Sequence, residues 1–422
     1  MYIFLAGLVF VVGYAGIALE HRVKLSKSAI ALFMGAVLWL IVAVAGIPTI
    51  EEDIFRTGSD IFSIVVFLLA AMSLIEILVH YKFFDLLRGK LFQMHLDEQK
   101  QFLLIALITF FLSAFLDNLT TTIVMIQIAR RFFKGENMLI TTGAIVVAAN
   151  AGGAFSPIGD VTTIMLWFAH KYTALEIIKI GFLPSITLWA VTIGFMYRRI
   201  RGETRDTANE IITKLNATEK FVIGLIIISF LLPVAMNLFK LPPYMGLVIG
   251  LGMVWLVIDL FKRFTTHPTH LEASIEEFIK KTDIPSLKFF IGILLAVGAL
   301  HSLGLLHVLA GIVYGDHPAF GTMVAGNIGL GLLSAILDNV PLTAMAIQIL
   351  QTDQTSLWVL LALSVGTGGS LLVIGSAAGV VAMGMVKELN FAKYFRIVFL
   401  PGILGYIAGI TVWYLQYLVF HF

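Results

Sequence analysis

Long apolar stretches separated by short polar loops run along the whole chain. Each is close to or longer than the roughly 20 residues that a helix needs to cross the hydrocarbon core of a bilayer. The first stretch lacks a basic leading region and a cleavage pattern, so we expect a retained span and not a signal peptide. The pattern predicts an all-α polytopic membrane protein with about ten spanning segments, at residues 1–19, 28–47, 60–79, 138–169, 176–197, 221–239, 243–261, 285–304, 356–386 and 397–420.

Two further apolar stretches, 101–130 and 318–350, are interrupted near the middle by Asp117–Asn118 and Asp338–Asn339. Lys and Arg flank the first stretch at both ends and the second at neither end, which places both ends of the first inside and both ends of the second outside. We therefore predict two re-entrant helical hairpins whose Asp-Asn tips approach the midplane from opposite sides. Irregular backbone at that depth is tolerated only where protein or a polar cavity covers it.

The distribution of basic residues sets the expected orientation. With the N-terminus outside, the inner loops collect 24 of the 28 Lys and Arg residues, a strong positive-inside bias. Both termini are then predicted on the outer (periplasmic) side. Segments 83–98 and 268–283 are expected to be short amphipathic helices in the inner interface.

An internal repeat underlies this layout. SAFLDNLTTTIVMIQI at 113–128 aligns with SAILDNVPLTAMAIQI at 334–349, with nine of 16 positions identical, and AGGAFSPIGD at 151–160 aligns with TGGSLLVIGS at 367–376. The first half makes an odd number of crossings, so the second half enters the membrane inverted, an organisation that marks secondary transporters. The predicted organisation is a first inverted repeat at 1–197 with a broken helix at 138–169, a cytoplasmic linker at 198–220, and a second repeat at 221–422 with a broken helix at 356–386.

The amino-acid composition further restricts the class of protein to which this chain can belong. Hydrophobic residues make up 59% of the chain and charged residues only 13%, too few to cover the surface of a soluble protein of this size. The absence of cysteine excludes disulfides, thiolate metal sites and cysteine nucleophiles. No basic patch interleaved with aromatic residues indicates a nucleic-acid partner, and nothing indicates a cofactor.

Three acidic residues, Asp117, Asp160 and Asp338, fall deep within apolar stretches. An ionisable group inside the membrane costs several kcal/mol, so such a residue is a functional candidate by default. The alternative is that each Asp caps the N-terminus of a half-helix, where the helix dipole favours an anion. A capping Asp can also face an ion, so both interpretations can hold together.

The two broken helices contain glycine pairs, Gly152–Gly153 and Gly368–Gly369, at matching places. Glycine and proline unwind a helix and free backbone carbonyls, which are hard ligands suited to Na⁺. The alternative is that these glycines only allow helices to pack closely. Packing alone does not explain the polar residues beside them.

The polar residues around these motifs are rich in oxygen and include no Lys or Arg, which favours a cation over an organic anion. We expect Na⁺ at Asp117, Asn118, Asn150 and Asp160, with Asp338 joining from the opposite tip. Asp160 aligns with Ser376, so the first-half site carries the charge. The candidate transport residues are completed by Thr121, Thr122, Ser156, Thr162, Thr163, Asn339, Thr343, Thr367, Ser370 and Ser376.

Glu76 and the histidines are candidates for roles linked to protons. Glu76, near the inner end of the span 60–79, is a candidate proton relay, with a side chain that snorkels to the interface as the alternative. The histidines lie mostly in loops and at span ends, where pH sensing is the one role we consider.

Four motifs together resemble those of the NhaD-type sodium/proton antiporters: LDNLTTT at 116–122, NAGGAFSPIGDVTT at 150–163, LDNVPL at 337–342 and GTGGSLLVIGSAAG at 366–379. That family is related to arsenite permeases and divalent-anion/sodium symporters. The resemblance implies extrusion of Na⁺ or Li⁺ coupled to proton entry in a bacterial inner membrane, and hence pH homeostasis. It also implies a homodimer with a scaffold domain and a mobile transport domain.

Dicarboxylate-carrying relatives place Ser-Asn-Thr at the hairpin tips, where this chain has Asp117 and Asp338 in the Ser position. Carboxylates there should repel a dianion and attract a cation. The second tip departs from the first, because Pro341 and Leu342 replace Thr120 and Thr121 and leave it fewer hydroxyls.

The mechanism that we expect is competition of Na⁺ and H⁺ for carboxylates at the midplane, exposed alternately to each side. Three alternatives are weighed against it. The missing basic residues oppose an anion carrier for arsenite or organic acids. The absence of an intact protease motif opposes a membrane-embedded enzyme, since Pro157 stands where an aspartyl protease has Gly. A channel has no need of two inverted broken-helix motifs.

Overall fold

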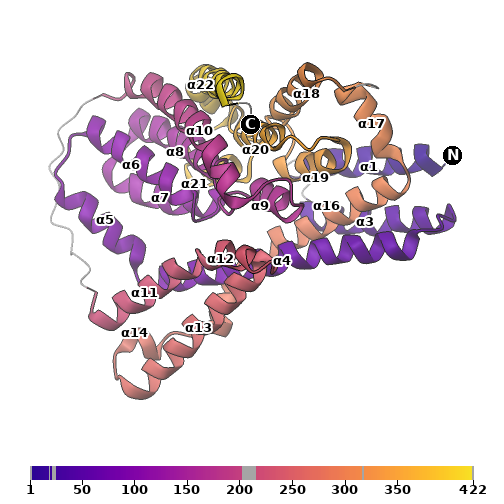
Figure 1. Cartoon of the computed structure of the whole chain (residues 1–422). Helices are drawn as coiled ribbons and strands as arrows, with labels where there is room; N and C mark the ends of the chain where they lie inside the picture. Colours follow the sequence, from indigo (N-terminus) through magenta and orange to yellow (C-terminus); the bar gives the residue numbers. More distant parts are fainter. Residues whose placement is uncertain (1, 19, 21–24, 202–214, 316–317, 421–422) are drawn as a thin grey trace. The chain divides into compact units, whose positions relative to one another are not determined.

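The computed structural model describes residues 2–18, 20, 25–201, 215–315 and 318–420, which form 21 helices and, within those ranges, no strand (Figure 1). Six of these helices are long and apolar enough to cross a membrane. The prediction of an all-α polytopic membrane protein is confirmed. The six are α3 (Lys27–Val44), α4 (Ile50–His80), α10 (Ala174–Tyr197), α13 (Pro243–Phe264), α16 (Ile284–Ser302) and α22 (Phe391–Phe420).

Other predicted spans are shorter or divided. The span predicted at 1–19 is α1 (Tyr2–Ala18), and the one at 221–239 is two helices, α11 (Ala217–Ser229) and α12 (Leu232–Leu238). Pro233 explains the division, since proline donates no backbone hydrogen bond and its ring clashes with the carbonyl four residues earlier. Sequence analysis assigned no element to 305–314, where the structure has α17 (Leu305–Tyr314) after a turn at Gly304, whose φ is +74°.

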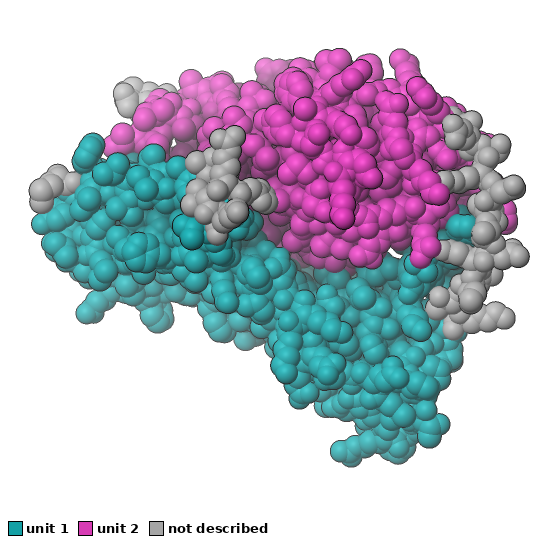
Figure 2. All heavy atoms as spheres, turned by 180° about the vertical axis from the view of Figure 1, so that it is seen from behind, with its two compact units in different colours: residues 1–93, 209–306 teal, residues 94–208, 307–422 magenta. Residues whose placement is uncertain are grey.

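The chain forms two compact units, each built from one stretch of each predicted repeat (Figure 2). Unit 1 contains residues 1–93 and 209–306, and unit 2 contains 94–208 and 307–422. The central part of the predicted linker, residues 202–214, lies outside the described residues, as do the terminal residues 1 and 421–422. Besides the helices already given, unit 1 includes α5 (Phe83–Gln93), α14 (Pro268–Leu271) and α15 (Ile275–Lys281).

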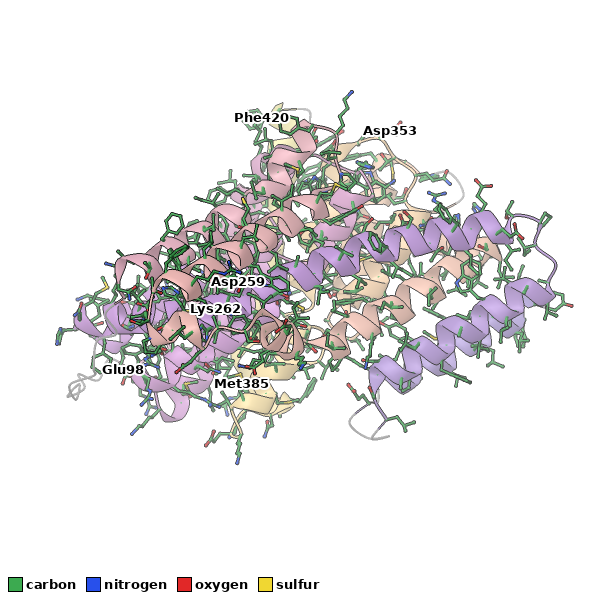
Figure 3. All side chains as sticks on the ribbon, turned by 90° about the horizontal axis from the view of Figure 1, so that it is seen from below. Glu98, Asp259, Lys262, Asp353, Met385 and Phe420 are labelled. Carbon is green, nitrogen blue, oxygen red and sulfur yellow. The ribbon has the colours of Figure 1, made fainter. Side chains whose placement is uncertain are left out.

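Unit 1 is organised around the close pair α3 and α16 (Figure 1). Glycines allow this approach: a Cβ on Gly35 would lie 2.7 Å from the carbonyl oxygen of Gly292. α16 and α13 both pack against α4. Near its end α13 carries an ion pair one turn apart, Asp259 with Lys262 at 3.4 Å (Figure 3).

Unit 2 contains four places where a helix stops within an apolar stretch and a new one begins. The first pair of breaks separates α6 (Glu98–Ser113) from α7 (Asn118–Phe132), and α8 (Gly135–Gly153) from α9 (Val161–Phe168). The second pair separates α18 (Phe320–Leu333) from α19 (Asn339–Ile349), and α20 (Thr355–Gly368) from α21 (Ala377–Met385). α8 and α20 are buried on nearly all sides, which explains why their sequences are apolar without an amphipathic stripe.

The order and spacing of helices recur along the chain. α5 and α6 begin at Phe83 and Glu98, and α17 and α18 begin 222 residues later, at Leu305 and Phe320. α9 begins at Val161, and α21 begins 216 residues later, at Ala377. These two offsets match those of the repeated motifs to within one residue.

Candidate functional site

Each of the four helices that follow a break in unit 2 begins with a residue whose side chain caps it: Asp117 on α7, Asp160 on α9, Asp338 on α19 and Ser376 on α21. The carboxylates accept hydrogen bonds from the backbone N–H groups of Thr120 at 2.8 Å, Thr162 at 2.9 Å and Val340 at 3.1 Å. The Ser376 hydroxyl accepts one from Gly379 at 3.2 Å. The capping interpretation is therefore correct for all three aspartates.

Asp160 has further partners beyond its cap. The side-chain nitrogen of Asn118 donates to Asp160 Oδ2 at 2.6 Å, and that of Asn339 lies 3.3 Å from Oδ1 and 3.5 Å from Oδ2. Only 1% of Asp160 is exposed. The asparagine that begins α7 and the asparagine that begins α19, from the two predicted repeats, thus converge on one buried carboxylate.

Asn150, near the end of α8, extends this set of contacts. Its Oδ1 accepts from Asn118 at 2.9 Å, and its Nδ2 donates to the Ser376 hydroxyl at 3.3 Å. We call the connected residues Ser376, Asn150, Asn118, Asp160 and Asn339 the Asp160 cluster. All five are among the candidate transport residues taken from the motifs.

The charge of the Asp160 cluster has no cationic partner among the described residues. Asp117 and Asp338 add to the negative charge, since both interact electrostatically with Asp160. The positive ends of the capped helices stabilise these carboxylates. The result is an oxygen-rich, negatively charged cluster of hard ligands, which suits an alkali cation better than a transition metal. Within the described residues, no group of three or more His, Cys, Asp or Glu side chains could hold a resident metal.

Comparisons with known proteins identify the family of this chain. A family model described as a citrate transporter matches residues 14–366. Sodium/proton antiporter 2 of Arabidopsis thaliana is 36% identical over 96% of this chain and 98% of its own length, and antiporter 1 is 36% identical over 96% and 71%. The Na(+)/H(+) antiporter NhaD of Alkalimonas amylolytica is 30% identical over 96% of this chain and 88% of its own length. The chain belongs to the NhaD-type sodium/proton antiporter family.

Membership of the NhaD-type family confirms the resemblance drawn from the four motifs. This family is one of transporters, so the chain is a transporter and not an enzyme. The broader family model takes its description from a carrier of an organic anion, whereas these relatives are described as cation antiporters.

The threonines that follow Asp160 and Asn118 in the motifs fall into two groups. Thr162 and Thr163 are fixed around Asp160: the Thr162 hydroxyl donates to Asp160 Oδ1 at 3.0 Å, and the Thr163 hydroxyl donates to the Asp160 carbonyl at 2.8 Å. Thr121 and Thr122, on the first turn of α7, are fully buried, and their hydroxyls form no hydrogen bond within the described part of the chain. A buried hydroxyl without a partner is costly, so Thr121 and Thr122 are unsatisfied polar groups on the first turn of α7.

Four other candidate hydroxyls bond to nearby backbone. Thr343 donates to Asn339 O at 2.9 Å, Thr367 to Leu363 O at 2.6 Å and Ser370 to Thr367 O at 2.6 Å. Ser156, in the break between α8 and α9, donates to the carbonyl oxygen of Ala114, in the break between α6 and α7. These four side chains stabilise the helix ends around the Asp160 cluster and are not part of its chain of contacts.

The glycines of the two breaks allow the backbone to approach itself closely within each break. A Cβ on Gly153 would lie 2.7 Å from the carbonyl oxygen of Gly159, and a Cβ on Gly369 would lie 2.7 Å from that of Gly375. Only glycine therefore allows each broken segment to fold back on itself. The equivalence of these two contacts shows that both halves build the same local structure.

Sequence reasoning missed Ser113 and Ser334, the first residues of the repeated sixteen-residue motif. The Ser113 hydroxyl donates to Ala149 O at 2.7 Å, and the Ser334 hydroxyl donates to Val365 O at 2.9 Å. Each serine fixes the end of one helix, α6 or α18, to the helix that breaks beside it. Their identity at equivalent positions of the repeat was the signal that could have identified them.

Glu76 lies in α4, in unit 1, and is half-buried. Its electrostatic partner is Lys281, the last residue of α15. The Asp160 cluster lies in unit 2, so the structure does not group Glu76 with it.

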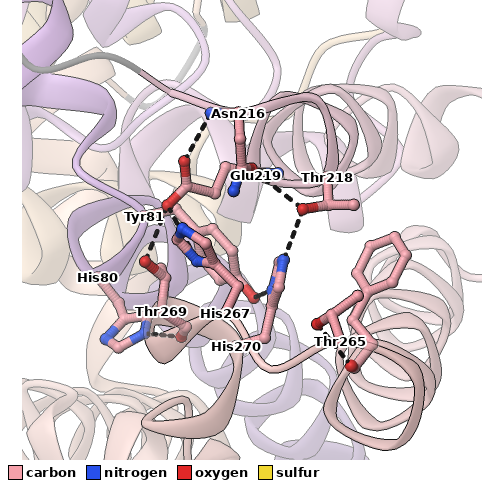
Figure 4. Close-up of polar contacts among 10 residues, drawn as sticks. His80, Tyr81, Asn216, Thr218, Glu219, Thr265, His267, Thr269 and His270 are labelled. Atoms are coloured by element: carbon pink, nitrogen blue, oxygen red, sulfur yellow. Dashed lines mark hydrogen bonds and ion pairs between the residues drawn. The ribbon is translucent and has the colours of Figure 1, made fainter.

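Unit 1 has a buried polar network of its own, which sequence reasoning also missed (Figure 4). Tyr81, directly after α4, bonds through its hydroxyl to Nδ1 of His270 at 2.9 Å, and Nε2 of His270 bonds to the Thr218 hydroxyl at 2.8 Å. Thr218 in turn donates to Oδ1 of Asn216 at 3.0 Å. We call these residues, with Glu219, the His270 network; it joins the end of α4, the start of α11 and α14.

The Thr218 hydroxyl has a single proton, and this sets which group donates in its contact with His270. The Thr218 proton is used toward Asn216, so Thr218 accepts from His270 Nε2–H. In the neutral imidazole with this tautomer, Nδ1 accepts from the Tyr81 hydroxyl. Burial, with the neighbouring His267 and His80, lowers the pKa of His270, and these outweigh the opposing effect of Glu219. Glu219 itself accepts from the Thr269 hydroxyl at 2.8 Å and from the backbone N–H of Asn216 at 2.8 Å.

Proposed function

We propose that this protein exchanges cytoplasmic Na⁺, or Li⁺, for external H⁺ by alternating access, with Na⁺ and H⁺ competing for Asp160. The observation that carries the proposal is the burial of Asp160 between Asn118 and Asn339 without a cationic partner in the described part of the chain. A buried carboxylate must be neutralised by a proton or a cation. Exchange of the two follows if only one is bound at a time.

The proposed Na⁺ ligands are Asp117, Asn118, Asn150 and Asp160. Asn118 and Asn150 already lie within hydrogen-bond distance of one another, and Asp117 is the residue before Asn118. An amide that donates to a carboxylate presents its carbonyl oxygen instead after a half-turn of its end group. Asn118 would then ligate Na⁺ together with the carboxylate to which it donates in this structure.

The proposed architecture is an inverted repeat, 1–197 and 221–422, joined by a cytoplasmic linker. Its hairpins would be 101–130 and 318–350, its broken helices 138–169 and 356–386. The recurrence of helix starts at an offset of 222 residues supports it. All four interrupted stretches lie in unit 2, so we propose unit 2 as the mobile transport part and unit 1 as the scaffold of a homodimer.

The proposed location is a bacterial inner membrane, with both termini outside. Its support is the positive-inside bias and relatives from bacteria such as Alkalimonas amylolytica and Halomonas elongata.

The second candidate function is transport of an organic anion, favoured by the description of the family model as a citrate transporter. Four helix N-termini bearing only neutral caps would form an anion site. Three of the four caps here are carboxylates, which repel an anion. This charge favours the cation.

Purified protein in proteoliposomes tests the proposal. A pH gradient, acidic inside, is imposed and NaCl is added outside, with KCl and citrate as controls. We expect Na⁺ to dissipate the gradient with the wild-type protein and not with Asp160→Asn. Asparagine is itself a good N-cap, so this variant should fold. The matched control is Asp259→Asn, which removes a half-exposed carboxylate of α13 and should leave exchange unchanged. Accumulation of citrate without a response to Na⁺ would support the anion carrier instead.

A further inference from the structure

Unit 2 contains a pocket of about 760 Å³ that the Asp160 cluster does not use. The pocket lies at the ends of α7 and α21 and at the starts of α8 and α22, so residues of both predicted repeats line it. These ends of α7 and α21 are opposite to the ends at Asn118 and Ser376. Met385, the last residue of α21, is one of its lining residues (Figure 3). Four basic side chains line the pocket, Arg130, Lys134, Lys387 and Lys393, against two acidic ones, Glu136 and Glu388.

The contacts of these side chains leave two ammonium groups free. Arg130 donates to the carbonyl oxygen of Met385 and so caps the end of α21, and Lys393 donates to Glu388 O at 2.9 Å. Lys134 and Lys387 are exposed and form no hydrogen bond or ion pair within the described part of the chain. An excess of positive charge therefore faces the pocket.

The floor of the pocket is apolar. Phe133, Met138 and Val386 line it and are buried, with Phe133 only 1% exposed and Val386 4%. A soluble anion gains nothing from such a floor. A phospholipid uses both features, because its phosphate faces the cations while its glycerol and upper acyl chain cover apolar surface.

A cation pathway is the competing explanation for a pocket at these helix ends. Exposed lysines at its rim would raise the electrostatic cost of a passing Na⁺. The charge of the pocket thus opposes a role as the inner entrance for Na⁺ and favours an anionic ligand. Its place at the ends of apolar helices, where basic residues accumulate, is the depth of lipid headgroups.

We propose that this pocket binds the headgroup of an anionic phospholipid, with Lys134 and Lys387 at the phosphate. The bound lipid connects the α7–α8 turn to the α21–α22 link. The opposite ends of these helices, about 22 Å away along α7 and about 14 Å away along α21 at 1.5 Å per residue, carry Asn118 and Ser376. The lipid thereby stabilises the arrangement of the helices that meet in the Asp160 cluster.

Lipid binding to the purified full-length protein in detergent tests this proposal without any measurement of transport. Native mass spectrometry and thermal unfolding are followed during titration with phosphatidylglycerol, phosphatidylcholine or inorganic phosphate. We expect phosphatidylglycerol to bind and to raise Tm, and the other two to have little effect. For the double variant Lys134→Ala/Lys387→Ala we expect roughly tenfold or greater loss of phosphatidylglycerol affinity.

The matched control is Lys280→Ala/Lys288→Ala, which removes two exposed lysines of unit 1 and should leave the affinity unchanged. Equal affinity of wild type and the pocket variant would overturn the proposal, since the lipid would then bind elsewhere. Equal stabilisation by inorganic phosphate would overturn the assignment to a lipid. If the pocket variant is unstable, the single variant Lys387→Gln carries the same expectation with a smaller loss. Because binding is the readout, failure of the proposed antiport would not affect either outcome.

Discussion

The Asp160 cluster in unit 2 and the His270 network in unit 1 are both buried and both join segments distant in the sequence, but they differ in charge. In the His270 network each proton of Tyr81, His270 and Thr218 has one acceptor, and the lowered pKa of His270 favours a neutral imidazole. Its one carboxylate, Glu219, has a cationic partner in His267 when that imidazole is protonated, since His267 Nδ1 lies 3.9 Å away. In the Asp160 cluster the asparagines donate to a carboxylate that no cation neutralises in the described part of the chain. We therefore expect changes in the His270 network to alter stability, and changes in the Asp160 cluster to alter ion binding.

After loss of the Asp160 carboxylate itself, we expect the largest change in Na⁺ affinity when an asparagine side chain is removed from the Asp160 cluster. Asn118→Ala eliminates the contacts to both Asp160 and Asn150. We expect Na⁺ affinity to fall roughly 10- to 100-fold, the usual effect of losing a group that orients a metal ligand. The half-saturating Na⁺ concentration for exchange in proteoliposomes measures it.

The control for Asn118 is another buried asparagine of unit 2. Asn327 accepts from Tyr314 at 2.9 Å and donates to Leu357 O at 2.9 Å. Asn327→Ala should lower thermal stability and leave Na⁺ affinity as in wild type. An equal loss of affinity in both variants would show that the effect of Asn118 is only structural.

A smaller effect is expected from Asp338→Asn. The variant keeps a capping residue at the start of α19 but removes a charge that interacts with Asp160. We expect Na⁺ affinity to fall by about tenfold or less, since the interaction acts at longer range than a direct contact. Titration of exchange against Na⁺ measures this affinity, and an unchanged value would exclude Asp338 from the site.

The His270 network should respond in stability and not in transport. Tyr81→Phe leaves the buried Nδ1 of His270 without a donor, at a cost of about 1–3 kcal/mol. We expect a lower Tm with unchanged Na⁺ affinity. Tyr244→Phe is the control, because the Tyr244 hydroxyl makes no hydrogen bond within the described residues.

The smallest effect concerns pH. Because the pKa of His270 is lowered from 6.5 in the folded protein, the unfolded chain binds more protons than the folded one just below pH 6.5. The contribution of His270 to stability is full above pH 6.5 and is lost as pH falls below it. Thermal unfolding between pH 5 and 8 should show this loss in wild type and a weaker one in His270→Gln. A wild-type stability that rises as pH falls would contradict the assignment.

The Asp160 cluster could be predicted from sequence because charge is rare in apolar stretches. Asp117, Asp160 and Asp338 stand out there, and the repeat identifies Asn118 and Asn339 as equivalent. What remained open was whether the aspartates cap helices or face an ion; in the structure all three cap, and Asp160 also has side-chain partners.

The His270 network could not be predicted, because polar residues are ordinary in loops. Tyr81 and His270 are 189 residues apart, and no local pattern indicates that they meet. Pro233 could have indicated that the predicted span 221–239 is divided into two helices. A single span was predicted because the stretch is apolar throughout. Helix α17 was missed because it is only ten residues long.

Calorimetry of Na⁺ binding to the purified protein tests the central claim most directly. Na⁺ is titrated near neutral pH in buffers of different ionisation enthalpy, which reports the protons released for each Na⁺ bound. If Na⁺ and H⁺ compete for Asp160, wild type releases protons on binding Na⁺, and Asp160→Asn neither binds Na⁺ with comparable affinity nor releases them. Na⁺ binding to wild type without proton release, or undiminished in Asp160→Asn, would contradict competition at this carboxylate.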